Sequence, residues 1–270
     1  DWSSNVCSSD LAHTNSVSWY GLSPKIHRKE GSNNMASPVE AVPKTPEDTT
    51  TMREFPLSCL KPTDRVLIIG STTSGKTTGM YNIVRAMHAN GKAKDGRGFQ
   101  FALGFSKTEK SNGNLGGPVK EDDGAVKYKY GIMPRFCAHH GFKEDVLEQF
   151  MEYQQSTKNI GKMKQSLIVL DDVLSQKGVK NSSILEEFQQ NARNFGCGNV
   201  TCCHGVKQMK PDSRSQYHFV LCYNLPAEQQ KKFFECFAEG IFNRNRVAFD
   251  NTWRRLQKEC GRYWALAIDL

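Results

Sequence analysis

One run of residues in the first third of the chain constrains its fold more than any other. The apolar segment Val66–Ile69 leads into the pattern Gly-x-x-x-x-Gly-Lys-Thr, and a helical stretch, Thr77–Asn90, follows. A strand, a glycine loop and a helix in this order form the phosphate loop, or Walker A motif, of nucleoside-triphosphate-binding proteins. Glycine permits backbone angles that a β-carbon forbids, so the peptide N–H groups of the loop can converge on phosphate oxygens. We therefore predict that this chain binds a nucleoside triphosphate.

The phosphate loop predicts roles for individual residues. We expect Lys76 to reach the β- and γ-phosphates and the Thr77 hydroxyl to bind Mg²⁺. The predicted cofactors are therefore ATP and Mg²⁺. The residues predicted to bind the nucleotide are Gly70, Ser71, Thr72, Thr73, Ser74, Gly75, Lys76, Thr77 and Thr78.

A second motif supplies carboxylates. The apolar strand Ser166–Leu170 runs directly into Asp171 and Asp172. A strand that ends in Asp beside a phosphate loop, a Walker B motif, holds Mg²⁺, usually through water. An acid next to it can orient and deprotonate the attacking water. We assign Asp171 to the metal and Asp172 to the water, and the residues alone leave open that the two roles are exchanged.

Strand-like and helical segments alternate from Leu57 onward, which predicts an α/β fold with a parallel sheet. The predicted strands are Val66–Ile69, Gly98–Ser106, Ser166–Leu170, Asn199–Cys203 and Tyr217–Tyr223, and the predicted helices are Thr77–Asn90, Phe142–Asn159, Ser183–Asn194, Pro226–Ala238 and Val247–Cys260. The chain closes on the apolar stretch Tyr263–Ile268. Ser183 and Glu186 have the spacing of a capping box. Gly98–Ser106 comes between the two motif strands, as in ring-forming ATPase motors. The predicted fold class is an α/β P-loop NTPase of the ASCE or RecA-like type, with a mostly parallel central sheet flanked by helices.

The N-terminal part of the chain has a different composition. From Lys29 to Pro56 it is rich in polar residues and proline and almost free of large apolar residues, which is typical of disorder. We predict a disordered leader at residues 1–56 and an ATPase domain at residues 57–270. The first methionine is Met35, and residues 1–34 resemble translated sequencing-adapter read-through, so we exclude them from the predicted fold.

The segment Asn191–Arg214 adds a more specific pattern: a helix, a basic residue, a strand, a polar residue, a short loop with proline, and an arginine. With the two motifs above and the later run Leu-Cys-Tyr-Asn-Leu-Pro, this order resembles the FtsK–HerA superfamily. The resemblance is to the poxvirus-type DNA-packaging ATPases of double-jelly-roll DNA viruses, virophages and Polinton-like elements, and it covers residues 57–270.

The resemblance implies further catalytic residues. Arg193 is the first choice for an arginine finger given to a neighbouring subunit, and Arg214 is the second. The family usually has Arg-His where this chain has Arg193 and Asn194. It also places glutamine at the strand end where alignment on Arg214 puts His204, as a sensor of the γ-phosphate. Gln208 follows four residues later, so the sensor is either His204 or Gln208.

Composition and resemblance together indicate the partners. The net charge of +8 favours a polyanion such as nucleic acid. No apolar run reaches the ~18–20 residues of a membrane span, and no secretion signal opens the chain, so we expect an intracellular, non-membrane protein. The resemblance implies a homo-oligomeric ring that pumps double-stranded DNA into a capsid and contacts vertex or portal proteins. It implies DNA contacts through lysines such as Lys207 and Lys210 and through the insertion Lys110–Tyr130.

Two alternative functions remain open from the sequence. One is a DNA helicase or conjugation-type pump of the same superfamily. The other is a nucleotide-gated DNA-binding scaffold with little turnover, which the histidine at the sensor position makes plausible.

Overall fold

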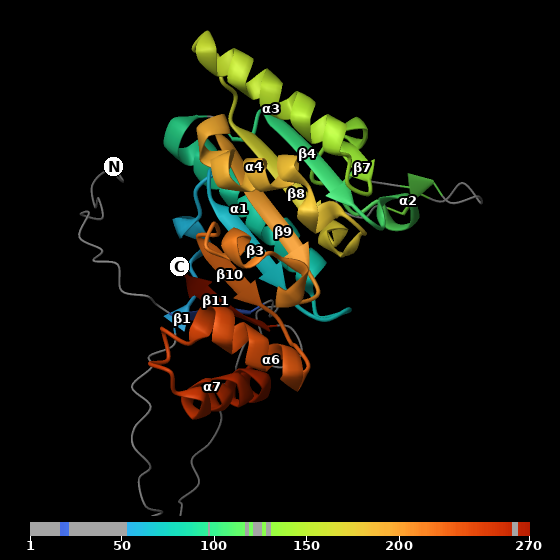
Figure 1. Ribbon diagram of the computed structural model, residues 1–270. Helices are drawn as coiled ribbons and strands as arrows, with labels where there is room; N and C mark the ends of the chain where they lie inside the picture. Colours follow the sequence, from blue (N-terminus) through green and yellow to red (C-terminus); the bar gives the residue numbers. More distant parts are fainter. Residues whose placement is uncertain are drawn as a thin grey trace, which may run out of the picture.

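The computed structural model describes residues 17–21, 53–96, 98–116, 119–120, 126–127, 131–260 and 264–270. A nine-stranded sheet forms its centre, in the order β2-β1-β11-β10-β3-β9-β8-β4-β7 (Figure 1). In that order the strands are Arg53–Glu54, Val17–Gly21, Trp264–Asp269, Phe219–Cys222, Arg65–Ile69, Cys197–Cys203, Ser166–Asp171, Phe101–Ser106 and Ala138–His140. The six strands from β10 to β7 are parallel, and β11 and β1 continue the sheet in antiparallel pairs.

Both faces of the sheet are buried. On β3, Leu67 and Ile69 belong to one apolar cluster, while Val66 and Ile68 belong to the cluster on the opposite face. This alternation follows from the two-residue period of a strand, and burial on both faces explains why β3 reads as an uninterrupted apolar run.

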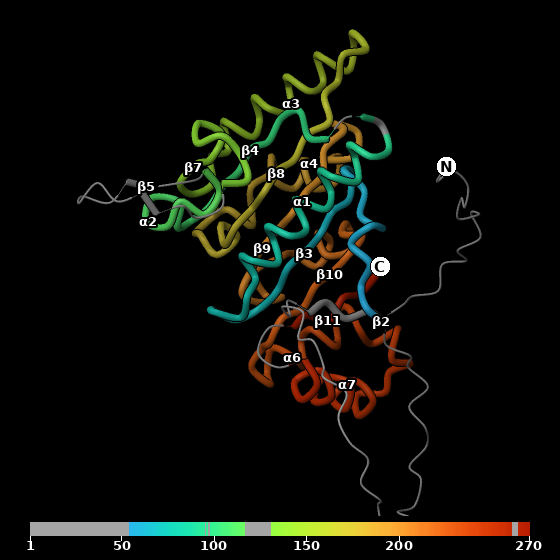
Figure 2. Tube along the Cα trace, turned by 180° about the vertical axis from the view of Figure 1, so that it is seen from behind, coloured from blue at the N-terminus to red at the C-terminus, as the bar shows by residue number. Residues whose placement is uncertain are grey.

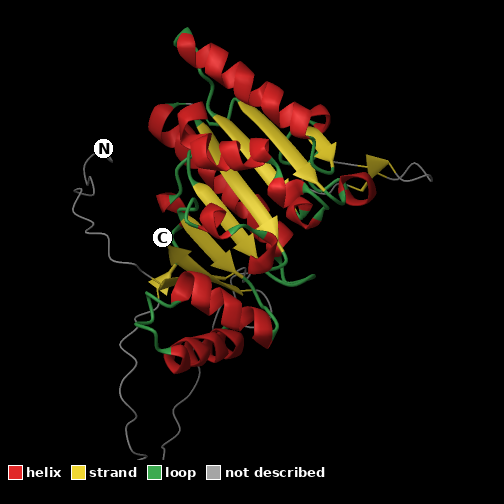
Figure 3. Cartoon of the chain, in the orientation of Figure 1, coloured by secondary structure: helices red, strands yellow, loops and turns green. Residues whose placement is uncertain are grey.

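Helices cover the two faces unequally, as Figures 2 and 3 show. The helix α1, Lys76–Asp95, packs on one face through buried residues such as Met80 and Ile83. On the other face lie α3 (Glu144–Asn159), α4 (Ser183–Asn191), α6 (Ala227–Phe233), which continues as a π-helical segment over Phe234–Ala238, and α7 (Arg246–Glu259). The short helices α2 (Glu109–Asn112) and α5 (Pro211–Arg214) and the two-stranded hairpin β5 (Val119–Lys120) and β6 (Val126–Lys127) complete the described α-helices and β-strands.

The predicted fold class is correct, and each strand and helix predicted from residue 57 onward has a counterpart. The α1 helix runs past its predicted end to Asp95, and α4 ends at Asn191, where a 3₁₀ turn, Ala192–Phe195, takes over. The strand between the motif strands in the sheet is β9, not the predicted Gly98–Ser106 segment. That segment forms β4 on the outer side of β8.

The capping box was predicted at the wrong residues. The N-cap of α4 is Ser182, whose Oγ accepts the N–H of Leu185 at 3.1 Å. The Glu186 carboxylate does not turn back to this cap but accepts a hydrogen bond from Lys210 Nζ at 2.6 Å. The N-cap lies one residue before the predicted one, so the residue three positions after it is Leu185 and not Glu186.

The predicted leader contributes strands to the sheet. Val17–Gly21 forms β1, which pairs antiparallel with all but the last residue of β11, and Arg53–Glu54 forms β2 beside it. Phe55 is buried, with its ring 5.5 Å from that of Phe219. The expectation that residues 1–56 stand outside the fold therefore fails for these segments, while the remainder of 1–52 lies outside the described residues.

Removing residues 1–22 should lower the thermal unfolding midpoint, because the outer edge of β11 loses its antiparallel partner. A loss of 1 kcal/mol corresponds to roughly 2–4 °C in a chain of this size, and we expect a shift at least that large in scanning fluorimetry. Removing residues 1–15 is the matched control, since β1 stays in place. Equal midpoints for the two truncations would show that β1 does not stabilise the domain.

Candidate functional site

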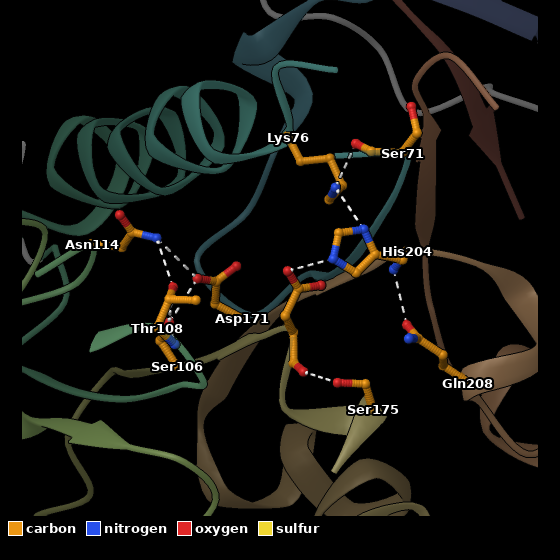
Figure 4. Close-up of polar contacts among 10 residues, drawn as sticks. Ser71, Lys76, Ser106, Thr108, Asn114, Asp171, Ser175, His204 and Gln208 are labelled. Atoms are coloured by element: carbon orange, nitrogen blue, oxygen red, sulfur yellow. Dashed lines mark hydrogen bonds and ion pairs between the residues drawn. The ribbon is translucent and has the colours of Figure 1, made fainter. Parts of the chain in front are cut away.

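Three neighbouring parallel strands end at the candidate site. β3 leads into the phosphate loop, β8 ends at Asp171, and β9, between them, is followed by His204. Because parallel neighbours end at the same edge of a sheet, residues more than a hundred positions apart in the sequence meet there. Figure 4 shows Lys76, His204 and Asp171 around this edge.

The phosphate loop, Gly70–Thr78, has the backbone that its glycines predict. Gly75 has a φ of 99°, and Thr73 has a φ of 62°. A β-carbon on Gly70 would come within 2.7 Å of the Tyr223 side chain, so this position accepts only glycine without rearrangement. Ser71 anchors the loop to the turn after β10, because its N–H and its hydroxyl both donate to the Asn224 carbonyl.

Lys76 is buried and points into the site. Its Nζ donates to the Ser71 carbonyl at 2.8 Å and lies 3.3 Å from Nδ1 of His204. An ammonium group can only donate, so Nδ1 is the acceptor and the His204 proton sits on Nε2. Nε2 in turn lies 2.9 Å from Oδ2 of Asp172. Lys76, His204 and Asp172 thus form one hydrogen-bonded chain across the site, with a neutral imidazole in the middle.

Asp172 has features of a residue held in place for a ligand. Its φ of 56° lies in the left-handed region, which non-glycine residues adopt at some cost in energy. Its Oδ1 is buried and has no hydrogen-bond partner within the described part of the chain. Such an oxygen can accept a hydrogen bond from a water molecule.

Asp171 is the most buried acid of the site. Burial and, second, the neighbouring Asp172 raise the pKa of Asp171, while hydrogen bonds from Ser106 and Asn114 and the charge of Lys76 oppose this rise. With the half-buried Thr77 it offers hard oxygen ligands, which are those that Mg²⁺ prefers. The donor set therefore fits Mg²⁺.

Gln208 and the two predicted DNA-binding lysines have partners inside the chain. Gln208 accepts the backbone N–H of His204 through its Oε1 at 2.9 Å, so it shapes the end of β9. Lys207 lies 3.2 Å from Glu228, and Lys210 lies 2.6 Å from Glu186. The Lys210 prediction is weakened most, since that pair is partly buried. Of the insertion, the structure describes only parts, with Lys120 and Lys127 on the strands of the hairpin.

The two predicted arginines lie at different ends of β9. Arg193 is exposed in the 3₁₀ turn before β9. The pKa of the Arg65 guanidinium is lowered first by burial and second by the nearby charge of Arg193, so Arg193 lies close to Arg65, the first residue of β3. It therefore lies at the opposite end of the strands from the site. Arg214 donates to the carbonyls of Val206 and Met209, which makes it a brace for the turn after β9.

Two residues of the site escaped prediction. Ser106, the last residue of β4, and Asn114, in the loop after α2, both reach the Asp171 carboxylate. A serine at a strand end and an asparagine in a glycine-rich loop belong to no known motif. The pairing of β4 with β8 places Ser106 beside Asp171, and the fold of the loop after α2 places Asn114 there.

No protein-family model matches the sequence, and no curated protein matches it. Among solved structures, the chain is similar to the genome packaging NTPase B204 from Sulfolobus turreted icosahedral virus 2 in complex with ATP-gammaS, with 14% identity and a TM-score of 0.45, over 69% of this chain and 88% of that one. The DNA-packaging ATPase B204 from Sulfolobus Turreted Icosahedral Virus is 15% identical, with a TM-score of 0.44, over 68% of this chain and 87% of that one. The N-terminal domain of zonular occludens toxin from Neisseria meningitidis is 12% identical, with a TM-score of 0.32, over 59% of this chain and 76% of that one.

The first two of these are packaging NTPases. Within the described residues, no helix combines the length and the apolar character needed to cross a membrane.

Replacing Asp171 with asparagine should stabilise the nucleotide-free fold near neutral pH. The folded-state pKa of Asp171 is raised, so its ionised form destabilises the fold above the ordinary carboxyl pKa, and this penalty disappears on acidification below it. We expect Asp171→Asn to raise the thermal midpoint by a few degrees near pH 7 and the gain to shrink toward about pH 4.

The exposed Asp212→Asn serves as the control for the loss of one negative charge. A midpoint for Asp171→Asn below that of the unmodified chain near pH 7 would contradict the prediction.

Proposed function

We propose that this chain is a Mg²⁺-dependent ATPase that drives double-stranded DNA into a viral capsid. The observation that carries the ATPase assignment is the meeting of Lys76, His204, Asp171 and Asp172 at the ends of three adjacent strands. The α/β fold, the phosphate loop and the two acids are the parts that ATP hydrolysis requires.

Hydrolysis in this site begins with a change of partners for Lys76. Bound triphosphate replaces the Ser71 carbonyl and His204 as the acceptor of its ammonium protons. His204 Nδ1, which is an acceptor in this tautomer, is then free to accept a hydrogen bond from water. Asp172, with its unpartnered Oδ1, orients the attacking water and accepts its proton.

Thr77 and Asp171 would hold Mg²⁺, and the ion would supply neutralisation of the charge on the triphosphate. Asp171 is suited to this role because it is already ordered by two donors before nucleotide arrives.

Arg193 serves best as a finger across a subunit boundary. It precedes β9, whose seven residues span about 20 Å at 3.3 Å per residue, so it lies far from its own phosphate loop. It is also exposed and therefore accessible to a neighbour. Arg214 is committed to two backbone carbonyls and is the weaker candidate. A head-to-tail homo-oligomeric ring brings Arg193 of one subunit to the loop of the next.

DNA and capsid are the proposed partners because the sequence resembles DNA-packaging ATPases and its net charge is +8. The contacts are expected to go to DNA phosphates, which carry little sequence information. Since Lys207 and Lys210 pair with acids of the chain, their DNA contacts would require those ion pairs to open.

One observation favours a second function, a nucleotide-gated DNA-binding scaffold with little turnover. His204 ties Lys76 to Asp172, so two catalytic groups satisfy one another in the nucleotide-free chain. A scaffold would bind ATP and DNA but hydrolyse ATP slowly whether or not DNA is present.

The discriminating experiment measures ATP hydrolysis with and without double-stranded DNA. A motor hydrolyses ATP and accelerates when DNA is added, whereas slow, unstimulated turnover supports the scaffold. Strand displacement on a forked duplex would instead support a helicase. Lys76→Ala is the inactive reference, and Lys92→Ala, an exposed lysine at the other end of α1, is the matched control.

Asp172→Asn should retain Mg-ATP binding and lose hydrolysis, because the amide cannot accept the proton of water while Asp171 still holds the metal. We expect a decrease in turnover of at least about 100-fold, within the range for a general base. Fluorescent-nucleotide titration and phosphate release measure the two effects separately. Loss of nucleotide binding would mean that Asp171 and Asp172 have exchanged roles.

Mixing two inactive variants tests the finger. Arg193→Ala keeps an intact phosphate loop, and Lys76→Ala keeps an intact Arg193, so mixed rings contain some interfaces with both. A positioned arginine contributes ~10³–10⁵ in rate, and partial rescue of hydrolysis is therefore measurable. Absence of rescue in rings shown by mass spectrometry to be mixed would rule out action across the boundary, and Arg214→Ala would be tested next.

A further inference from the structure

Two buried side chains reach Asp171 from outside both sequence motifs (Figure 4). Ser106 Oγ lies 2.8 Å from Asp171 Oδ2, and Asn114 Nδ2 lies 3.5 Å from the same oxygen. Ser106 is fully buried and Asn114 is 9% exposed, so water does not substitute freely for these contacts.

The directions of these hydrogen bonds follow from the chemistry of the groups. An ionised carboxylate only accepts, so the Ser106 hydroxyl and the Asn114 amide must donate to Asp171. The Asn114 amide nitrogen also lies 3.3 Å from Thr108 Oγ1, which accepts its second proton. Both donors use Oδ2, and neither occupies Oδ1. The pair thus fixes the rotation of the carboxylate and leaves one oxygen for a ligand.

The backbone around Asn114 is itself held by the phosphate-binding helix. The Tyr81 hydroxyl, on α1, donates to the Asn114 carbonyl. The next residue, Leu115, donates its N–H to Glu109 at 2.9 Å and accepts the N–H of Ile132 at 2.9 Å. The position of Asn114 is therefore set jointly by its hydrogen bond from Tyr81 of α1 and by the backbone hydrogen bonds of the next residue, Leu115, to Glu109 and Ile132.

We propose that Ser106 and Asn114 are positioning residues that hold the Asp171 carboxylate in the orientation that binds the metal of Mg-ATP. The inference rests on the proposed role of Asp171. Residues that orient a metal ligand through hydrogen bonds typically contribute about 10- to 100-fold in metal affinity. Ser106, with the shorter contact, contributes the larger share.

The experiment measures metal binding directly rather than turnover. Mn²⁺ replaces Mg²⁺, and free Mn²⁺ is followed by electron paramagnetic resonance during titration of the full chain with a non-hydrolysable ATP analogue. We expect Ser106→Ala and Asn114→Ala each to weaken Mn²⁺ binding by about tenfold or more, without changing affinity for the analogue in EDTA. Ser106→Thr keeps the hydroxyl and should recover most of the loss.

Ser111→Ala is the matched control, because Ser111 is an exposed serine of α2 that donates to the Thr108 carbonyl and does not contact Asp171. Unmodified Mn²⁺ affinity in both Ser106→Ala and Asn114→Ala would overturn the proposal. A loss of affinity that is matched by a large fall in the thermal midpoint would assign these residues to folding and would also overturn it.

The outcome is separable from that of the proposed function. An unmodified chain that binds Mn²⁺ with the analogue but hydrolyses no ATP would contradict the ATPase proposal, while the variants would still decide the role of Ser106 and Asn114. Equal Mn²⁺ affinity in the unmodified chain and Asp171→Asn would remove Asp171 as a ligand and overturn the inference.

Discussion

The parallel register of β3, β9 and β8 is the constraint on which the site depends. Ile69 pairs with Cys203, and Cys202 pairs with Asp171, so the three strands end together. The strands are mostly apolar because both faces of the sheet are covered, and the polar side chains buried within β9, Asn199 and Thr201, hydrogen-bond to each other. The charged groups lie at the strand ends. Phosphate-binding and acidic groups are thereby concentrated at one edge, next to the N-terminus of α1.

Such concentration has an energetic cost that the fold partly offsets. Burial and the adjacent Asp172 both raise the pKa of Asp171, and the hydrogen bonds from Ser106 and Asn114 counteract this. A neutral His204 lies between Lys76 and Asp172 and is hydrogen-bonded to both. Lys76 and His204 are thus hydrogen-bonded in the nucleotide-free site, whereas Asp172 Oδ1 has no partner within the described residues. A triphosphate that approaches Lys76 has to replace existing contacts.

The sequence predicted the positions of the helices and strands better than the contacts between distant segments. The segments Ser166–Leu170 and Val247–Cys260 were predicted within one residue, because burial of those side chains is a local property. The end of α1 was not, since the helix runs on to Asp95 instead of ending at Asn90. The Ser183–Glu186 capping box failed, since Ser182 is the N-cap and Glu186 pairs with Lys210 from a distant turn. Val17–Gly21 was missed because its stability as a strand comes from β11, nearly the whole chain away.

The sequence by itself determined the class of fold and the positions of the glycine loop and the two adjacent acids, because the strands and helices around these residues are marked by local apolar patterns. Only the tertiary structure decided which residues surround them. It brought His204 between Lys76 and Asp172, placed Ser106 and Asn114 on Asp171, turned Arg214 into a brace and left Arg193 at the far end of β9. These outcomes depend on the order of strands in the sheet, which is set by packing between distant segments and leaves no local mark in the chain.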